Sequence, residues 1–150
     1  MVDYERLRPD RRLWDLSTMR RLLARHGACA PPRPGVQITG SKGKGTTAAL
    51  LDALVTAGGG RSGCYTSPHL ETLLERIRVG GRNIDVESLE GLLRELLATP
   101  GERPPTFFEA MTVAAAEWFA RERVDLAIYE VGLGGRYDAT TALPIDAAVL

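Results

Sequence analysis

The chain has 150 residues, which falls within the roughly 100–200 residues of a single globular domain. Apolar residues make up 44% and charged residues 25%, a composition that excludes a disordered or fibrous protein. Nineteen basic residues balance 19 acidic ones, so no net field favours nucleic acid or an anionic membrane. No apolar run approaches the roughly 20 residues of a membrane span, and the start has no signal-peptide pattern. We therefore expect a cytoplasmic location, with neither nucleic-acid nor membrane partners.

The first third of the chain carries the order of elements that a phosphate site requires. Apolar residues at helical spacing predict a helix over Leu13–His26, and the prolines of Ala30–Gly35 predict a linker. A short strand, Val36–Thr39, leads through a glycine-rich loop, Gly40–Gly45, into a helix over Thr46–Ala57. Strand, glycine loop and helix in this order favour an anion site at the helix N-terminus.

The rest of the chain alternates strands and helices. Strands are predicted at Ser62–Thr66, at Glu75–Val79 and Arg82–Ile84 as a hairpin, at Val124–Val131, and at Ile145–Leu150. Two helices separate them, one capped by Asp85 and running to Leu97, and one with a wide apolar face from Phe107 to Phe119. This alternation predicts an α/β fold of the P-loop NTPase type, with a mostly parallel sheet covered by helices on both faces. The chain ends inside an apparent core strand, which favours a truncated chain or fragment.

The 19 basic residues comprise 17 arginines and two lysines, and both lysines lie in the glycine-rich loop. Lysine is a compact point charge, whereas arginine is a planar fork, so a loop around phosphate favours lysine. We predict that Lys44 bridges the β- and γ-phosphates and that the Thr46 hydroxyl ligates Mg²⁺. Lys42 is either a looser phosphate contact or solvated. The predicted nucleotide-binding residues are Gly40, Ser41, Lys42, Gly43, Lys44, Gly45, Thr46 and Thr47.

A second candidate element begins at the end of the strand near residue 130. Glu130 is a carboxylate at the carboxyl end of a buried strand, where ligands bind in open α/β sheets. We predict that it is a second Mg²⁺ ligand across from Thr46, and an arginine-paired structural carboxylate is the alternative. The following glycine-rich loop carries Arg136 and Asp138 and is predicted to order over bound substrate.

Five segments together resemble the folylpolyglutamate synthase and dihydrofolate synthase family, the folate branch of the Mur ligase superfamily. They are Ile38–Thr46, Tyr65–Leu70, Glu75–Val79, Thr106–Glu109 and Glu130–Thr140, in family-like order over nearly the whole chain. The phosphate loop, the Ser-Pro-His-Leu turn and the Gly-Leu-Gly-Gly-Arg loop are specific to this branch in combination.

The resemblance implies an ATP- and Mg²⁺-dependent ligase that phosphorylates a carboxylate, after which the amine of glutamate attacks the acyl phosphate to give an amide. It implies catalytic roles for Lys44 and Glu130, and Thr46 and Glu130 as metal ligands. The residues implied to border the pterin or folate pocket are Thr66, Ser67, Pro68, His69, Leu70, Gly135, Arg136 and Asp138. The implied partners are small molecules: ATP, folate or dihydropteroate, and glutamate.

The chain departs from the family pattern at Ser41-Lys42, where Thr-Asn is common, and at Thr141, where an Asn is common. Family members are also much longer, and their later segment supplies a further metal-binding His, a modified lysine and an amino-acid-binding domain. We therefore expect residues 1–150 to be one incomplete ATP-binding domain, with residues 1–35 as helix and linker and 36–150 as the P-loop core. Such a fragment would bind nucleotide without completing catalysis.

Several alternatives stay open at this point. The chain could belong to a Mur-type ligase with another acceptor, or be a non-catalytic P-loop nucleotide-binding module. The sequence does not separate dihydropteroate from folate as substrate, and it does not set the oligomeric state. His69 could serve either the turn geometry or a substrate contact. Glu109 is expected to serve the start of its helix, and Trp118 and the phenylalanines at helical spacing, Phe107 and Phe119, are expected in the core.

Overall fold

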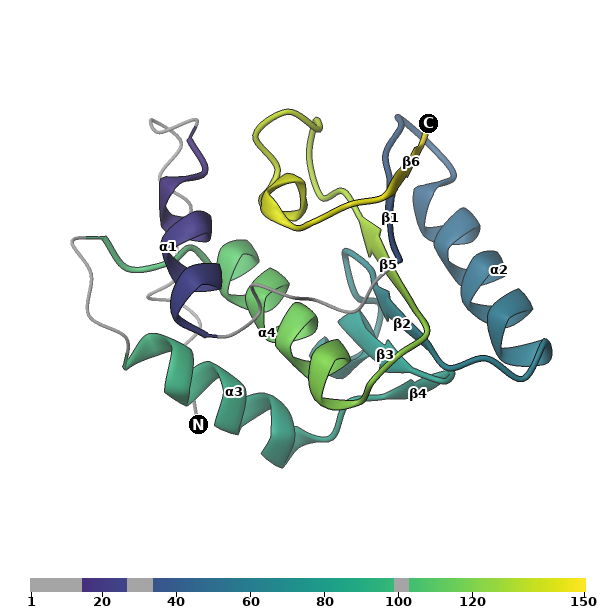
Figure 1. Cartoon of the computed structure of the whole chain (residues 1–150), viewed down its shortest axis with the longest axis horizontal. Helices are drawn as coiled ribbons and strands as arrows, with labels where there is room; N and C mark the ends of the chain where they lie inside the picture. The colour runs from purple at the N-terminus through teal and green to yellow at the C-terminus, as the bar shows by residue number, and fades with distance from the viewer. Residues whose placement is uncertain (1–14, 27–33, 99–102) are drawn as a thin grey trace.

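The computed structural model describes residues 15–26, 34–98 and 103–150, which form one six-stranded sheet with helices on both faces (Figure 1). The strands are β1 (Gly35–Ile38), β2 (Ser62–Tyr65), β3 (Ile77–Val79), β4 (Arg82–Asn83), β5 (Leu126–Glu130) and β6 (Ala147–Val149). The helices are α1 (Ser17–Arg25), α2 (Lys44–Ala57), α3 (Val86–Leu97) and α4 (Phe107–Arg121), with 3₁₀ turns at Leu73–Arg76 and Ala139–Ala142.

The sheet has the order β4-β3-β2-β5-β1-β6. Neighbours from β2 to β6 pair in parallel, whereas β3 and β4 form an antiparallel hairpin at one edge. The predicted fold class, a mostly parallel sheet covered on both faces, is confirmed. No helix among the described residues is long and apolar enough to cross a membrane.

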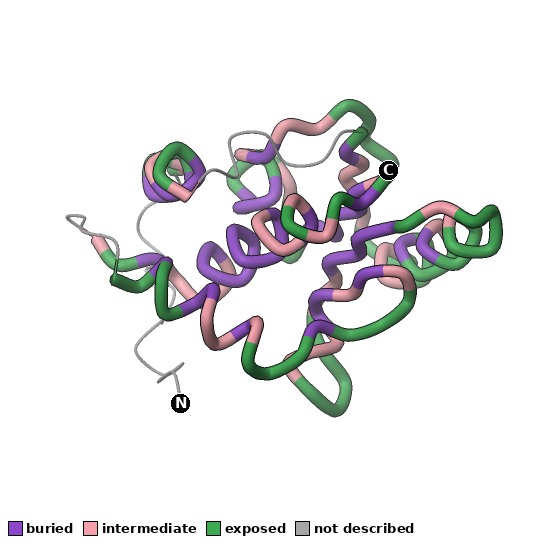
Figure 2. Tube along the Cα trace, turned by 60° about the horizontal axis from the view of Figure 1, so that its bottom comes forward, coloured by how far each residue is buried: buried purple, intermediate pink, exposed green. Residues whose placement is uncertain are grey.

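The two faces of the sheet are covered unequally. On one face α4 packs against β2 and is itself covered by α3 and α1, so that α4 is buried along most of its length (Figure 2). The closest approach is at Gly63 of β2, where an added Cβ would lie 2.6 Å from the Phe119 ring. Among the described residues, α2 is the helix that covers the other face, over a smaller cluster that includes Ile38, Cys64 and Ile128.

Side-chain caps fix where two helices begin. Asp85 caps α3 by accepting a hydrogen bond from the Ser88 N–H at 2.8 Å, as predicted. Thr106 caps α4 by accepting from the Glu109 N–H at 3.2 Å, and the Glu109 carboxylate accepts from the Thr106 N–H at 2.7 Å. Glu109 therefore serves the helix start through a capping box, as expected.

Several predictions differ from the structure in where an element begins or in how far it is buried. Helix α2 begins at Lys44 rather than Thr46, with Gly43 as its N-cap. The predicted strand from Glu75 begins only at Ile77, because a capping box between Thr72 and Glu75 nucleates a 3₁₀ turn there. Strand β6 was expected in the core but lies at the sheet edge, and all three of its residues are exposed.

Some predictions concern residues outside the described ranges. These are the first part of the Leu13–His26 helix, most of the Ala30–Gly35 linker, and part of the loop between α3 and α4.

Candidate nucleotide and metal site

Three of the sequence segments singled out above follow parallel strands, so the carboxyl ends of these strands lie at the same end of the sheet. Strand β5 pairs with β1 on one side, with Ile38 opposite Glu130, and with β2 on the other, with Tyr65 opposite Tyr129. The glycine-rich phosphate loop follows β1, the Ser-Pro-His-Leu turn follows β2, and the glycine loop at 132–135 follows β5. Parallel pairing therefore brings these segments together at the carboxyl ends of the strands, where ligands bind in α/β sheets.

The phosphate loop owes its shape to two glycines in the left-handed region. Gly40 has φ 131° and Gly43 has φ 77°, and an added Cβ at Gly43 would meet nothing within 4 Å. Glycine is required there for backbone conformation and not for lack of space. The loop ends at the N-terminus of α2, where the first N–H groups lack partners within the helix and favour an anion.

The loop's polar side chains differ in how far they are engaged. The Lys44 ammonium donates to the Gly40 carbonyl at 3.1 Å and so lies over the loop. The Thr47 hydroxyl donates to the Gly43 carbonyl at 3.0 Å, which ties it to its own helix. The side chains of Ser41, Lys42, Thr46 and Thr47 are exposed, whereas Lys44 is partly buried.

Glu130 is the residue that joins the three segments. It is only 4% exposed, and its Oε2 accepts a hydrogen bond from the Ser67 N–H at 2.8 Å. A Cβ added to Gly45 would lie 3.5 Å from Oε1 and 3.6 Å from Oε2, so the carboxylate faces the first turn of α2. Within the described ranges no ion pair joins Glu130 to an arginine or lysine.

The donors around Glu130 fit a hard cation that is shared with a nucleotide. Mg²⁺ prefers oxygen ligands and is commonly held by one or two protein groups together with phosphates and water. Glu130 offers a buried carboxylate beside Gly45, and the exposed Thr46 hydroxyl follows in the same helical turn. Among the described residues there is no group of three or more His, Cys, Asp or Glu side chains that could hold a metal ion.

Asp138 holds the glycine loop after β5 in place. One oxygen accepts from the N–H groups of Gly132 and Leu133 at 3.0 and 3.1 Å. The other accepts from the Thr140 N–H at 3.0 Å and from its hydroxyl at 2.6 Å. The buried carboxylate therefore has both oxygens engaged by its own loop, and Thr141 adds a hydroxyl bond to the Gly135 carbonyl at 2.7 Å.

The Ser-Pro-His-Leu turn is organised by Glu75. Its carboxylate accepts from the N–H groups of Leu70 at 2.9 Å, Glu71 at 3.1 Å and Thr72 at 2.9 Å. These bonds, the one from Leu70 foremost, lower the pKa of Glu75 below its ordinary value. Sequence reasoning gave Glu75 no role, although the Thr-x-x-Glu spacing is a recognisable capping-box signal.

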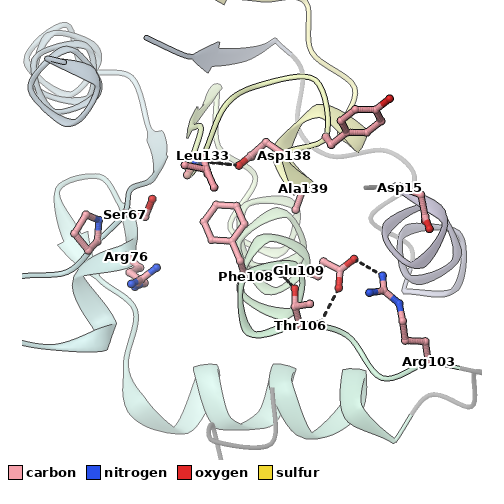
Figure 3. A pocket seen from close by; sticks show the side chains of 13 residues that line it. Asp15, Ser67, Arg76, Arg103, Thr106, Phe108, Glu109, Leu133, Asp138 and Ala139 are labelled. Carbon is pink, nitrogen blue, oxygen red and sulfur yellow. Dashed lines mark hydrogen bonds and ion pairs between the residues drawn. The ribbon is translucent and has the colours of Figure 1, made fainter. Parts of the chain in front are cut away.

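Beside the Ser67 turn lies a cavity of about 470 Å³ (Figure 3). Its lining comprises Asp15, Ser67, Pro68, Arg76, Arg103, Thr106, Phe108, Glu109, Gly132, Leu133, Tyr137, Asp138 and Ala139. The Phe108 ring faces the cavity and packs so closely on Gly132 that an added Cβ there would lie 2.6 Å from its Cζ. The volume is in the range of small-molecule sites, and the lining combines an aromatic ring with a few polar groups.

Only part of the predicted substrate set lines this cavity. Ser67, Pro68 and Asp138 do, whereas Thr66, His69, Leu70, Gly135 and Arg136 do not. The His69 Nδ1 accepts from the Arg76 Nε at 2.9 Å, and Leu70 is 91% exposed.

Arg76, Phe108 and Leu133 line the cavity but were not predicted. Phe108 belongs to the family-like segment Thr106–Glu109 but was given no role, because it is not one of the residues that repeat at helical spacing on the predicted apolar face. Arg76 is buried, with its guanidinium 5.2 Å from the centroid of the Phe107 ring.

Comparison with known proteins places this geometry in a family. No protein-family model matches the chain. The chain is 43% identical over 142 residues to a probable bifunctional folylpolyglutamate synthase/dihydropteroate synthase of Haloferax volcanii, covering 88% of this chain and 16% of that protein. It is 37% identical over 127 residues to the Escherichia coli dihydrofolate synthase/folylpolyglutamate synthase, covering 85% of this chain and 30% of that protein.

Solved structures agree with these relatives. The structure of E. coli FolC in complex with DHPP and ADP superimposes with a TM-score of 0.90 at 34% identity, covering 97% of this chain and 35% of that one. A Mycobacterium tuberculosis folylpolyglutamate synthase complexed with ADP gives a TM-score of 0.87 at 33% identity, covering 97% and 34%. The chain thus spans about a third or less of these relatives' length. By sequence and by fold, it belongs with the N-terminal portion of the folylpolyglutamate synthase and dihydrofolate synthase family.

Proposed function

We propose that this chain is the nucleotide-binding portion of an ATP-dependent amide ligase that adds L-glutamate to the carboxylate of a folate or dihydropteroate. The observation that carries the proposal is the position of Glu130, a buried carboxylate in contact with the phosphate-loop helix and with the Ser67 turn. One group then lies between a nucleotide site and a neighbouring cavity, as phosphoryl transfer from nucleotide to substrate requires.

In this proposal the loop from Gly40 to Thr47 binds the phosphates of ATP. Its support is the left-handed glycines, the free N–H groups at the start of α2, and the Lys44 ammonium lying over the loop. Lys44 neutralises charge on the transferring phosphoryl group, and catalysis is mainly positioning and charge neutralisation. Solved relatives contain ADP, and one contains AMPPNP, Mn and L-glutamate.

Thr46 and Glu130 would hold the Mg²⁺ ion. When bound, Mg²⁺ supplies charge that orients the phosphates and stabilises the transferring group. Glu130 holds its carboxylate in place through the Ser67 N–H and presents its other oxygen toward Gly45. The donor set of carboxylate and hydroxyl oxygens supports Mg²⁺, as does the Mn found in a solved relative.

The cavity of about 470 Å³ would bind the pterin-containing substrate. The Phe108 ring, which faces the cavity, suits stacking against a planar heterocycle, and Ser67 and Asp138 line the same cavity. The E. coli relative was solved with DHPP and ADP together. The aromatic ring in this cavity next to Ser67 favours a planar pterin over the acceptor of another Mur-type ligase.

We further propose that residues 1–150 are one ATP-binding domain of a longer ligase, in which the amino-acid-binding part lies outside the matched region. The parts of the relatives that this chain does not cover support this division. A cytoplasmic location fits an enzyme that consumes ATP.

The test is calorimetric titration of the chain with ATP in the presence and absence of Mg²⁺. We expect Mg²⁺-dependent binding that Lys44→Ala weakens by about tenfold or more, whereas Lys42→Ala at an exposed position has a smaller effect. Glu130→Gln, which keeps the side-chain volume and removes the charge, should abolish the Mg²⁺ dependence. A folded chain that binds ATP equally well after Lys44→Ala would refute the assignment of the loop.

A further inference from the structure

Arg76 brings a buried positive charge to the wall of the cavity. Its side chain is only 9% exposed. Figure 3 shows its guanidinium on the same side of the cavity as Ser67, directed toward the Phe108 ring. A buried guanidinium is costly unless an anion and hydrogen-bond acceptors compensate its charge. The groups that surround Arg76 therefore bear on its role.

The protein contacts of Arg76 compensate only part of this cost. Its Nε donates to the His69 Nδ1 at 2.9 Å, which fixes the orientation of the guanidinium plane, and its Cζ lies 5.2 Å from the centroid of the Phe107 ring. Burial raises the pKa of the nearby Tyr65 hydroxyl, which therefore stays neutral and cannot balance the charge. Among the residues that the structure describes, no ion pair joins Arg76 to a carboxylate.

The three carboxylates in the described lining of the cavity are engaged elsewhere. Glu109 accepts from the Arg103 guanidinium at 3.0 Å, so the second cation of the lining is paired. Asp138 has both oxygens bound by its own loop, and Asp15 accepts two hydrogen bonds from the first residue of α1. The charge of Arg76 is thus left to be balanced by an anion that enters the cavity.

Arg76 also lies beside the turn that connects the cavity with Glu130. The Arg76 carbonyl accepts from the Thr66 N–H at 3.0 Å, and the next residue, Ser67, donates its N–H to Glu130 at 2.8 Å. Both Ser67 and Arg76 line the cavity. An anion bound by Arg76 would therefore lie next to the turn that contacts the proposed metal ligand, as a carboxylate must to receive the phosphoryl group.

We propose that Arg76 binds the carboxylate of the pterin-containing substrate, the group that receives the phosphoryl group. The inference rests on the proposed function and adds the residue that recognises the reacting group. Arginine suits this task because its planar fork donates two parallel hydrogen bonds to a carboxylate. A ligand without the carboxylate would leave the buried charge unpaired, so the site should discriminate against it.

The test compares the binding of dihydropteroate with that of its uncharged carboxamide, by calorimetry in the absence of nucleotide. The wild-type chain should bind the carboxylate about tenfold or more tightly than the carboxamide, and Arg76→Gln should lose this preference. A purely structural role of Arg76 would weaken both ligands equally and keep their ratio. Arg78→Gln is the matched control, because Arg78 lies on β3, pairs with Asp52 at 3.5 Å and does not line the cavity; it should leave the ratio unchanged.

Arg76→Lys keeps the charge without the fork and should show a reduced preference, which provides the measurement if thermal unfolding shows that Arg76→Gln does not fold. A wild-type preference that persists unchanged in either variant would overturn the proposal. Dihydropteroate that binds the wild-type chain no more tightly than the carboxamide would overturn the role of Arg76 alone. A folded wild-type chain that binds neither ligand would overturn this role and the proposed substrate together, whereas the nucleotide assignment is tested separately by the ATP titration.

Discussion

Replacing Gly45 by Ala should separate folding stability from nucleotide binding. Gly45 lies in the first turn of α2 and is not among the residues with positive φ. The added Cβ would lie 3.5 and 3.6 Å from the two carboxylate oxygens of Glu130, which are ordinary van der Waals distances. The folded chain therefore accommodates the methyl group without moving its neighbours.

Opposite effects on stability and binding follow from this geometry. Ala in place of Gly within a helix stabilises by about 0.5–1 kcal/mol, which for a chain of this size raises Tm by roughly 1–4 °C. A Mg²⁺ ion needs oxygen ligands at about 2.0–2.1 Å, and a methyl group in contact with both oxygens blocks their approach from the phosphate-loop side. We expect Mg²⁺-ATP affinity to fall by at least about tenfold, or about 1.4 kcal/mol.

The assay pairs thermal unfolding with calorimetric Mg²⁺-ATP titration in one buffer. Gly91→Ala is the matched control, because Gly91 lies inside α3 and an added Cβ there meets nothing within 4 Å. It should raise Tm similarly and leave ATP binding unchanged. Gly45→Ala with wild-type affinity would refute the position assigned to the cation, and a lowered Tm would refute the claim that the methyl group fits.

Three further outcomes follow from particular contacts. Burial raises the pKa of Cys64 to about 12, so its thiol should react with disulfide reagents only on unfolding, and fast labelling of the native chain would contradict this. The contribution of the buried thiol to stability should be complete below its ordinary pKa of 9.0 and should be lost as pH rises toward 12. Because the pKa of Glu75 is lowered, its carboxylate stabilises the turn at pH values above its ordinary pKa of 4.5, and the turn loosens as the pH falls below that value. Glu75→Gln should speed amide exchange in the turn at neutral pH and remove this acid dependence, and unchanged exchange would contradict the prediction. Gly132→Ala should destabilise the fold by about 1–3 kcal/mol in denaturant unfolding, because its Cβ would lie 2.6 Å from the Phe108 ring. Gly135→Ala, whose Cβ would lie 3.7 Å from its nearest contact, is the control, and equal stability of the two variants would contradict the prediction.

Local sequence signals predicted the parts of the fold that local interactions determine. The glycine-rich loop between strand and helix, and the Asp85 cap of α3, follow from backbone conformations and hydrogen bonds within a few residues. The start of β3 was wrong because a capping box competed with strand propensity over the same residues. The exposure of β6 was also unpredictable, since an apolar strand has the same pattern at an edge as in the core.

The candidate site was predictable in its components but not in its contacts. Glu130 and the phosphate loop were identified from residue type and position, whereas the bond from the Ser67 N–H to Glu130 depends on strand register. Helical spacing gave Phe108 no role, and the cavity that its ring lines depends on the loop that begins at Gly132. Such a contact follows from tertiary packing, which helical periodicity does not encode.

The strand order explains why segments far apart in the sequence meet at one carboxylate. Strands β1 and β2 are consecutive in the sequence and are joined by α2, but in the sheet they are separated by β5, which comes much later in the sequence. Its last residue, Glu130, therefore ends between the loop that follows β1 and the turn that follows β2. An Asp at this position would be shorter by one methylene and could not keep both the Ser67 N–H bond and the contact with Gly45, so the site requires the length of Glu as well as its charge.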